Sequence, residues 1–267
     1  MEEIVYHTNF KYENSYWWFT ARSIVVRHII KKICKMKPGA SIIDIGCGTG
    51  GFASDLMQDG FNVIGLDTSE TALKYAKKRG INELHQTTLD KFPKNRFKLD
   101  AACALDVIEH IKDDKAFLAD VASVLDAGSW FIATVPAYQW LWSKHDEVHM
   151  HFRRYTKNEI SSLIENAGFK IKYATYFNSF LFLPAVLKRF KDKLTGAEKK
   201  QTEPVEEVSE STNKALHKIF ASEKNVLPNI KFPFGLSILV IAKKKTNGKH
   251  VKKQSYKHDQ KKYTESI

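Results

Sequence analysis

Residues 42–52 read Ile-Ile-Asp-Ile-Gly-Cys-Gly-Thr-Gly-Gly-Phe, an apolar strand that runs into a glycine-dense turn and then into a helix. Glycine has no Cβ, so Gly46, Gly48 and Gly50 allow the backbone to turn sharply and to approach a ligand closely. Free N–H groups at the start of the following helix would face the same ligand. The stretch therefore predicts a cofactor pocket at the carboxyl end of the first strand of an α/β sheet.

From residue 40 onward, apolar strands alternate with amphipathic helices, a pattern typical of βαβ units and a parallel sheet. We expect strands at 41–45, 62–66, 83–86, 100–105, 130–135, 170–176 and 236–242. We expect helices at 51–58, 69–79, 113–125 and 157–167, and an earlier helix at 21–35 that follows an aromatic cluster at 16–19. The expected parts are an N-terminal aromatic lid and helix (1–37), the core (38–187), a helical and partly mobile insertion (188–228), the last strand (229–245) and a tail (246–267).

Composition sets limits on the class of protein. The 267 residues, of which 43% are hydrophobic, are enough for a sizeable core. Three cysteines, Cys34, Cys47 and Cys103, have no CxxC spacing, which fits reduced thiols and gives no disulfide framework. The N-terminus lacks an apolar signal core, and the longest apolar run, at 176–187, is too short to span a bilayer. We therefore expect a cytoplasmic protein, with peripheral membrane contact as a second option.

The net charge of +12 suggests a nucleic-acid partner until it is divided along the chain. Residues 243–267 contain nine lysines against Asp259 and Glu265, so this end alone carries +7. A polar, lysine-rich end with few apolar residues is expected to be disordered. We expect the tail to serve solubility rather than nucleic-acid binding, with weak contact to an anionic membrane or polymer as the alternative.

Two cofactors compete for the glycine turn. Gly46, Gly48 and Gly51 satisfy the GxGxxG pattern, and Asp67 lies 21 residues after Gly46, near the place where a nicotinamide-binding fold carries its ribose carboxylate. Asp44 would lie beside the pyrophosphate of a dinucleotide, whereas a carboxylate suits S-adenosylmethionine (SAM), whose aminopropyl chain and sulfonium are cationic. Charge complementarity therefore favours SAM.

Three motifs follow one another along the chain: Asp44-x-Gly46-x-Gly48-x-Gly50, then Gly65-Leu-Asp67, then Asp106-Val-Ile-Glu109-His110. Together they resemble motif I, the acidic end of the second strand and the post-fourth-strand motif of class I SAM-dependent methyltransferases. The resemblance implies an α/β, Rossmann-like fold with a seven-stranded, mostly parallel sheet, an antiparallel last strand and helices on both faces. It also implies SAM as the cofactor and a small molecule as the methyl acceptor.

The same resemblance implies which residues hold the cofactor. Asp44 and the glycines would contact the methionyl part of SAM, and Asp67 its ribose hydroxyls. An alternative is that Asp67 only caps the following helix. At the end of the third strand, where many members have an aspartate near the adenine, this chain has Thr88 and Leu89 followed by Asp90. The residues that we expect to contact SAM are Asp44, Gly46, Cys47, Gly48, Gly50, Asp67, Thr68, Thr88, Leu89, Leu105, Asp106, Trp18 and Arg22.

The segment 135–156 follows the fifth expected strand and is dense in reactive side chains. It resembles the Pro-Ala-Tyr, Trp-Ser-x-His-Asp and His-x-Arg-Arg-Tyr-Thr signature of a bacterial and archaeal branch of these methyltransferases associated with polysaccharide and glycolipid assembly. His145 oriented by Asp146, or alternatively His151, is the expected general base, and the two arginines are expected to bind an anionic acceptor. The expected catalytic residues are His145, Asp146, His151, Arg153, Arg154 and Tyr155.

The same segment also contains four potential metal ligands: His145, Asp146, His149 and His151. Their spacing in an irregular loop is a weak ligand pattern, so we expect no bound metal. We expect Glu109 and His110 to support the sheet edge and the cofactor pocket rather than to take part in the reaction.

The sequence thus predicts a SAM-dependent methyltransferase that methylates a hydroxyl of a sugar, a glycolipid or another small anionic acceptor. Four alternatives remain: methylation of a phenol or quinone precursor, methylation of a nucleic acid, a non-catalytic SAM-binding module and a nicotinamide-dependent oxidoreductase. Fold and cofactor site determine neither the acceptor nor the oligomeric state. The acidic and basic side chains at the acceptor edge argue against the non-catalytic module.

Overall fold

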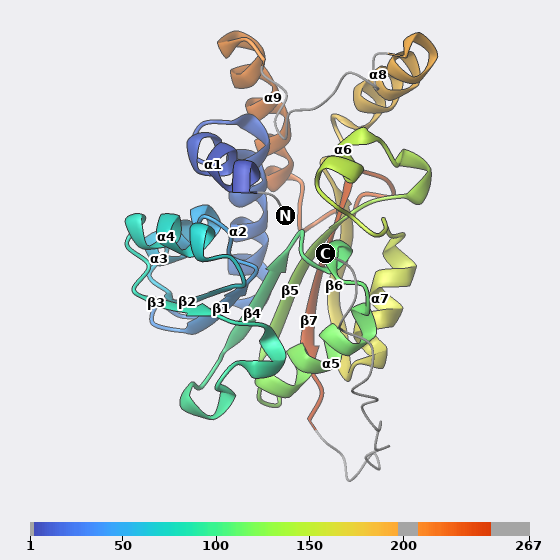
Figure 1. Cartoon of the computed structure of the whole chain (residues 1–267). Coiled ribbons are helices and arrows are strands. Elements are labelled where there is room, and N and C mark those ends of the chain that lie inside the picture. The colour runs from blue at the N-terminus through green and yellow to red at the C-terminus, as the bar shows by residue number, and fades with distance from the viewer. Residues whose placement is uncertain (1–2, 197–207, 247–267) are drawn as a thin grey trace, which may run out of the picture.

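The computed structural model describes residues 3–196 and 208–246. In this part of the chain, one sheet contains seven strands in the order β3-β2-β1-β4-β5-β7-β6 (Figure 1). The strands are β1 (Ser41–Ile45), β2 (Asn62–Asp67), β3 (Glu83–Gln86), β4 (Ala101–Leu105), β5 (Trp130–Pro136), β6 (Phe169–Phe177) and β7 (Ser237–Lys244). Neighbouring strands are parallel except at β7, which runs antiparallel to β5 and to β6. The predicted mostly parallel sheet with an antiparallel last strand is confirmed.

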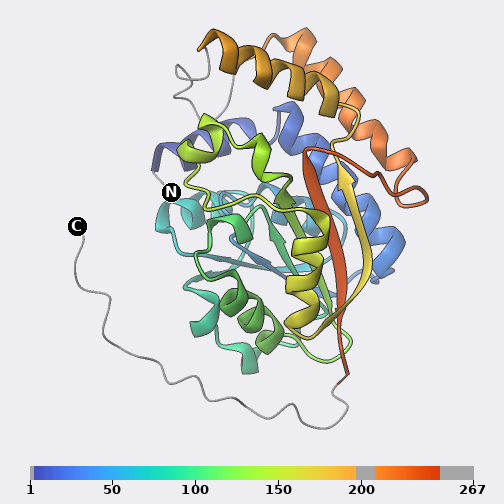
Figure 2. The ribbon, with the colours of Figure 1, turned by 90° about the vertical axis from the view of Figure 1, so that its right-hand side faces the viewer.

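Helices cover both faces of the sheet, as predicted (Figures 1 and 2). The helices are α1 (Glu3–Tyr12), α2 (Trp17–Cys34), α3 (Gly51–Gln58), α4 (Glu70–Lys78), α5 (Asp114–Val124), α6 (Lys144–Val148), α7 (Lys157–Asn166), α8 (Phe182–Thr195) and α9 (Glu210–Ser222). Successive side chains of a strand point to opposite faces, so Ile43 and Ile45 of β1 pack with α5 and α7, whereas Ile42 packs with α2 and α3. The carboxyl ends of the parallel strands meet at one edge of this layered body.

The N-terminal segment differs from the prediction. Helix α1 was not expected, and α2 begins at Trp17 rather than at residue 21, so most of the aromatic cluster lies inside the helix. The backbone N–H of Trp17 donates to the side-chain Oδ1 of Asn213, on α9, at 2.8 Å. The start of α2 is therefore capped by a residue 196 positions away, which no local pattern could indicate.

Part of the expected insertion at 188–228 packs against the rest of the protein. Helix α9 packs against α2, and the buried carboxylate of Glu223 accepts N–H bonds from residues 178–180 at 2.5–2.8 Å. The chain leaves the sheet at Phe177 of β6 and returns at Ser237 of β7, and these two residues are register partners. The α8–α9 segment therefore belongs to the long connection between two antiparallel strands, β6 and β7.

Two segments of the predicted organisation fall outside the described residues. They are 197–207, in the middle of the expected insertion, and 247–267, which is the expected basic tail without its first residue. In the two described ranges, no helix has both the length and the apolar character that crossing a membrane requires.

Candidate active site

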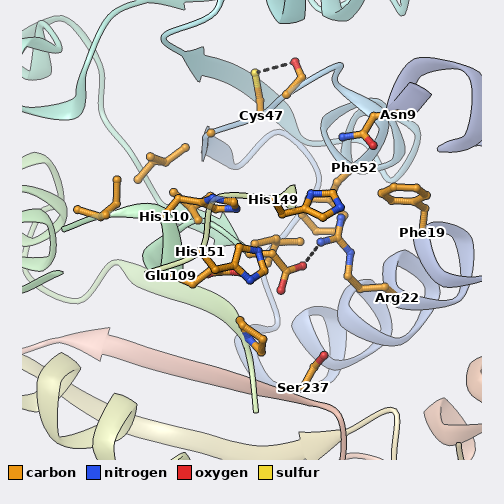
Figure 3. A pocket seen from close by; sticks show the side chains of 18 of the residues that line it. Asn9, Phe19, Arg22, Cys47, Phe52, Glu109, His110, His149, His151 and Ser237 are labelled. Atoms are coloured by element: carbon orange, nitrogen blue, oxygen red, sulfur yellow. Dashed lines mark hydrogen bonds and ion pairs between the residues drawn. The ribbon is translucent and has the colours of Figure 1, made fainter. Parts of the chain in front are cut away.

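A cavity of about 880 Å³ opens at the carboxyl ends of β1, β2 and β4 (Figure 3). Its walls come from these strand ends, from α1 and α2, from the segment between β5 and α7, and from α8. Small-molecule sites commonly measure roughly 300–1,000 Å³, and open α/β sheets bind ligands at this edge. The cavity therefore has the size and the position of a small-molecule site.

The glycine turn forms one wall of the cavity. The N–H groups of Gly46 and Cys47 donate to the carbonyl oxygen of Leu66 at 2.7 and 3.0 Å, which fixes the turn on β2. Gly48 has a φ of 55° and lines the cavity, and a Cβ built on it would meet no atom within 4 Å. The turn thus presents open backbone to a ligand at Gly48.

Gly50 has a different role from the predicted cofactor contact. Its φ is 83°, and a Cβ built on it would lie 2.5 Å from Cδ1 of Ile81 and 3.0 Å from Cα of Ala76 in α4. The residues that line the cavity do not include Gly50. This glycine therefore lets the turn pack closely against α4, and the predicted contact with SAM is corrected to a packing role.

Asp67 lies at the end of β2 and joins the turn to the cavity wall. Its two carboxylate oxygens accept the N–H groups of Gly48 and Ser69, each at 2.9 Å, and burial raises its pKa. Helix α4 is capped by the Ser69 hydroxyl, which accepts the N–H of Ala72 at 3.2 Å. A carboxylate has about four acceptor positions, so Asp67 can accept two further hydrogen bonds from a diol.

Asp44 supplies a buried negative charge beside the turn. Its side chain lines the cavity and the residue is only 4% exposed. Burial raises the pKa of Asp44 to about 7, although the nearby positive charge of Arg22 acts in the opposite direction. A cationic ligand would favour the ionised form of this carboxyl group, so the residue fits SAM, which carries an ammonium and a sulfonium.

The other predicted cofactor residues of the sheet edge also line the cavity. They are Gly46, Cys47, Thr68, Thr88, Leu89, Leu105 and Asp106. From α2, Trp18 and Arg22 also line it, and Arg22 pairs with Asp106 while its guanidinium lies 4.5 Å from the centroid of the Trp18 ring. The Nε of Arg22 is buried without a hydrogen-bond partner in the described part of the chain, which leaves a donor for a ligand.

The sequence reasoning missed the contribution of α1. Tyr6 and Asn9 line the cavity, and Glu13, just after the helix, accepts hydrogen bonds from the Thr49 hydroxyl and, at 3.1 Å, from the N–H of Gly51. The three residues recur at the spacing of one helical face. This spacing in the sequence could have indicated that the three side chains share one face. It does so only if the segment is already known to be a helix.

His151 lies on the acceptor side of the cavity and is oriented by Asp146. Its Nδ1 is 2.8 Å from Oδ1 of Asp146, which is fully buried. Asp146 also accepts two bonds from Arg154, at 2.7 and 2.9 Å, and the N–H of Ser143 at 2.9 Å. Asp146 was expected to orient His145, so the structure corrects the pairing: the histidine that it holds is His151.

The two arginines do not form the expected anion site. Arg153 donates to Asp114 at 2.9 Å and to the carbonyl of Lys112 at 2.7 Å, and the charge of Arg154 is paired with Asp146. Tyr155, a predicted catalytic residue, is 3% exposed in the core and donates to Asp114 at 2.9 Å. Arg153 and Tyr155 therefore fasten the segment to the start of α5. Their predicted roles at the acceptor are corrected to structural ones.

Glu109 and His110, which we expected only to support the pocket, lie in its wall beside His151 (Figure 3). The ring centroids of His110 and His151 are 4.6 Å apart, and those of His145 and His149 are 4.2 Å apart. Burial, together with the neighbouring histidines, lowers the pKa of His110 to about 3, so its imidazole is neutral. The sequence signal was the position of Glu109-His110 after a strand at the ligand-binding edge.

A family model described as a methyltransferase domain matches residues 20–174, which is more than half of the chain. The chain belongs to this methyltransferase family. The matched region is a SAM-dependent methyltransferase domain. The match favours methyl transfer over the nicotinamide-dependent oxidoreductase that the glycine pattern also allowed.

Curated relatives cover part of this methyltransferase. A protein named as a probable S-adenosylmethionine-dependent methyltransferase of Mycolicibacterium smegmatis is 26% identical over 160 residues, which are 58% of this chain and 60% of the relative. A ubiquinone biosynthesis O-methyltransferase of Rickettsia canadensis is 35% identical over 122 residues, which are 42% of this chain and 51% of the relative. The matched region thus spans between half and two thirds of each relative.

Solved methyltransferase structures share the fold. A SAM-dependent methyltransferase of Archaeoglobus fulgidus has a TM-score of 0.55 at 18% identity, covering 88% of this chain and 99% of that chain. Phosphoethanolamine N-methyltransferase 2 of Haemonchus contortus, solved with S-adenosylmethionine, has a TM-score of 0.54 at 19% identity, covering 86% of this chain and 53% of that chain. At these identities the likeness concerns the fold alone.

Replacing Asp67 by alanine is expected to remove most of the thermal stabilisation that S-adenosylhomocysteine gives to the methyltransferase. A ligand at 100 times its Kd stabilises the native state by about 2.7 kcal/mol, and this gain falls with affinity. Because the variant also loses two N–H contacts, the ligand-induced shift in melting temperature is compared, not the melting temperature itself. Glu70→Ala, at an exposed position of α4, is the control. An undiminished shift in Asp67→Ala would refute the assignment.

Proposed function

We propose that this methyltransferase transfers its methyl group to a hydroxyl oxygen, and that the hydroxyl belongs to a sugar joined to a lipid. One observation carries the first part of the proposal: His151, held by the fully buried Asp146, lines the same cavity as the glycine turn and Asp44. The cofactor residues and a fixed imidazole therefore share one enclosed space.

A hydroxyl acceptor explains why such a histidine is needed. When bound, SAM supplies a methyl carbon already activated by a sulfonium, so the protein has to align the acceptor and activate its oxygen. A neutral amine would need no activation, whereas a hydroxyl must lose its proton. An imidazole held through one nitrogen acts through the other, either as a general base or as the ligand of a metal ion. Both routes place His151 at the acceptor oxygen.

The shape of α8 supports an acceptor with an apolar part. One side of this helix lines the cavity through Ala185, Lys188, Arg189 and Asp192. The other side exposes large apolar side chains in a helical repeat: Leu183, Leu187, Phe190 and Leu194, which are 57–88% exposed. An amphipathic helix with such a face suits the boundary between water and lipid. The acceptor segment at 135–156, with its resemblance to the branch associated with glycolipid assembly, supports the same class.

The anionic acceptor that the sequence suggested is not part of this proposal, because Arg153 and Arg154 are both paired with carboxylates of the chain. A second candidate is the hydroxyl of a phenol or quinone precursor. It is favoured by the relatives named as ubiquinone biosynthesis O-methyltransferases and by the aromatic side chains of Trp17, Trp18 and Phe19 in the cavity wall.

A transfer screen with SAM labelled in its methyl group tests the proposal. Each sugar is offered with and without its lipid, beside phenols, primary amines and carboxylic acids, and the products are identified by mass spectrometry. We expect labelled methyl ethers, with at least tenfold higher kcat/KM for the lipid-linked form of a sugar than for the free sugar. Transfer to amines alone would refute O-methylation. Equal kcat/KM for free and lipid-linked sugars would refute the lipid-linked class.

A further inference from the structure

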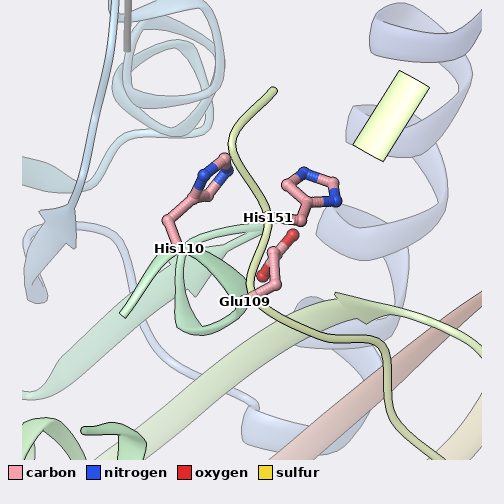
Figure 4. Close-up of side chains that lie close together, drawn as sticks. All are labelled: Glu109, His110 and His151. Carbon is pink, nitrogen blue, oxygen red and sulfur yellow. The ribbon is translucent and has the colours of Figure 1, made fainter. Parts of the chain in front are cut away.

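Three potential metal ligands converge in the acceptor wall: Glu109, His110 and His151 (Figure 4). One ligand atom from each lies within 4.8 Å of the others. The backbone holds them together, because the N–H of Phe152, next to His151, donates to the carbonyl of Glu109 at 2.8 Å. Two segments far apart in the sequence are thus joined at the cluster itself.

Glu109 is the least satisfied polar side chain in this wall. The residue is fully buried, and neither carboxylate oxygen has a hydrogen-bond partner in the described part of the chain. An ionised carboxylate that is buried without a donor or a positive partner is strongly disfavoured. Its nearest neighbours in the cluster are two imidazoles, which offer lone pairs rather than a fixed positive charge. A cation between the three groups would remove this penalty.

His151 has the arrangement of a metal-binding histidine. Its Nδ1 contacts Asp146, so Nε2 is the nitrogen that remains for a ligand of its own. Metal-bound histidines commonly contact a carboxylate through their second nitrogen, which fixes the ring. Asp146 is in turn held by Arg154 through two hydrogen bonds. The bonds that Asp146 forms with His151 and Arg154 therefore fix the orientation of the His151 ring.

We propose that Glu109, His110 and His151 bind a divalent first-row metal ion, with Zn²⁺ as the reference ion. Two imidazoles and one carboxylate form a donor set of catalytic zinc sites, which keep a further position open. Magnesium and calcium prefer oxygen ligands. With bonds of about 2.0–2.2 Å, the ligand atoms of a tetrahedral ion lie about 3.4 Å apart, so the side chains close inward by about 1 Å on binding.

The open position faces the cavity in which the acceptor must lie. A hydroxyl that binds the ion there has its pKa lowered, as metal-bound water does. This part of the inference rests on the proposed O-methylation, and it makes His151 act on the acceptor oxygen through the ion. Binding of the ion itself does not depend on the identity of the acceptor. The sequence-based expectation of no metal used the spacing within 145–151, and it did not join Glu109-His110 to His151.

The test is metal binding by the untagged full chain, freed of metal by a chelator and dialysed. Zn²⁺ affinity is measured by competition with a chromophoric chelator, and Co²⁺ is added as a spectroscopic probe of the ligand set. We expect one ion per chain, at least 100-fold weaker binding in both Glu109→Gln and His110→Ala, and loss of the Co²⁺ absorption bands. The matched control is His85→Ala, because His85 forms an exposed pair with Glu83 at 2.7 Å outside the cavity.

Folding of each variant is checked by its thermal shift with S-adenosylhomocysteine, and His110→Ala replaces Glu109→Gln if the latter does not fold. Unchanged Zn²⁺ affinity in the folded variants, or equal weakening in His85→Ala, would overturn the inference. The two proposals can fail separately. Metal binding without transfer to any hydroxyl would refute the proposed function alone, and transfer to a hydroxyl by a chain that binds no metal would refute the metal site alone.

Discussion

Turnover of a hydroxyl acceptor is expected to fall about 10²–10⁴-fold when His151 is replaced by alanine, while the affinity for SAM stays unchanged. The imidazole contacts Asp146 and lines the cavity, whereas Asp44 and Asp67 are the carboxylates that we assign to the cofactor. Removing a group that acts on the reacting oxygen lowers kcat and kcat/KM together. The measurement is steady-state kinetics with the hydroxyl acceptor identified in the transfer screen, together with the thermal shift by S-adenosylhomocysteine.

Two further variants separate chemistry from positioning at this residue. His151→Asn keeps an N–H donor near the position of Nδ1, which contacts Asp146, but has no imidazole nitrogen, so it should fold like the parent chain and lose activity like the alanine variant. His217→Ala changes a histidine of α9 that does not line the cavity, and its kcat should match that of the parent chain. Normal turnover in His151→Asn would mean that the histidine only supports Asp146.

Asp146→Ala is expected to lower the free energy of unfolding by about 3–5 kcal/mol, because it leaves a buried guanidinium without its partner. Arg154 is 7% exposed, and Asp146 accepts its two hydrogen bonds as well as those of His151 and Ser143. Burial disfavours the charged form of Asp146, but the bonds from His151 and Arg154 outweigh it and lower the pKa. Urea unfolding with a chelator present measures the loss without a contribution from bound metal.

The neighbouring residue of the same helix provides the control. Glu147 forms an exposed pair with Lys144 at 2.7 Å, and such surface pairs contribute about 0–1 kcal/mol. Glu147→Ala should therefore leave the unfolding midpoint in urea nearly unchanged. A loss in Asp146→Ala no larger than that in Glu147→Ala would contradict the assignment of the Asp146–Arg154 pair as the anchor of the acceptor segment.

The cofactor half of the molecule could be predicted because its signals are local. The turn at 46–50 and the strand ends at Asp67 and Asp106 each combine a strand, a turn and a carboxylate within a few residues. The parallel topology then brings these ends to one edge, as found. Gly50 was assigned wrongly because a sequence pattern does not say whether a glycine faces a ligand or a neighbouring helix.

For the acceptor side of the cavity, the sequence predicted which types of side chain are present but not how they pair. The sequence indicated that residues 145–155 contribute a histidine and a carboxylate to the site. It did not indicate which residue pairs with each charged side chain. Arg153 pairs with Asp114, which lies 39 residues earlier, and the start of α2 is capped from α9. Such contacts are decided by how distant elements pack, so no spacing rule within one segment could have assigned them.

The strand pair β6–β7 brings the two ends of a long connecting segment together. Phe177 and Ser237 are register partners, so the sheet holds together the two ends of the segment 178–236. Because the closure entropy of a connection grows slowly with its length, its length alone has little effect on the stability of the sheet. Helix α9 and Glu223 fix the later part of the segment to the folded body, whereas α8 exposes one face. Helix α8, which lines the acceptor side, lies in that segment, whereas Asp44, Asp67 and the glycine turn lie outside it. A change in α8 could therefore alter one wall on the acceptor side while Asp44, Asp67 and the glycine turn keep their positions.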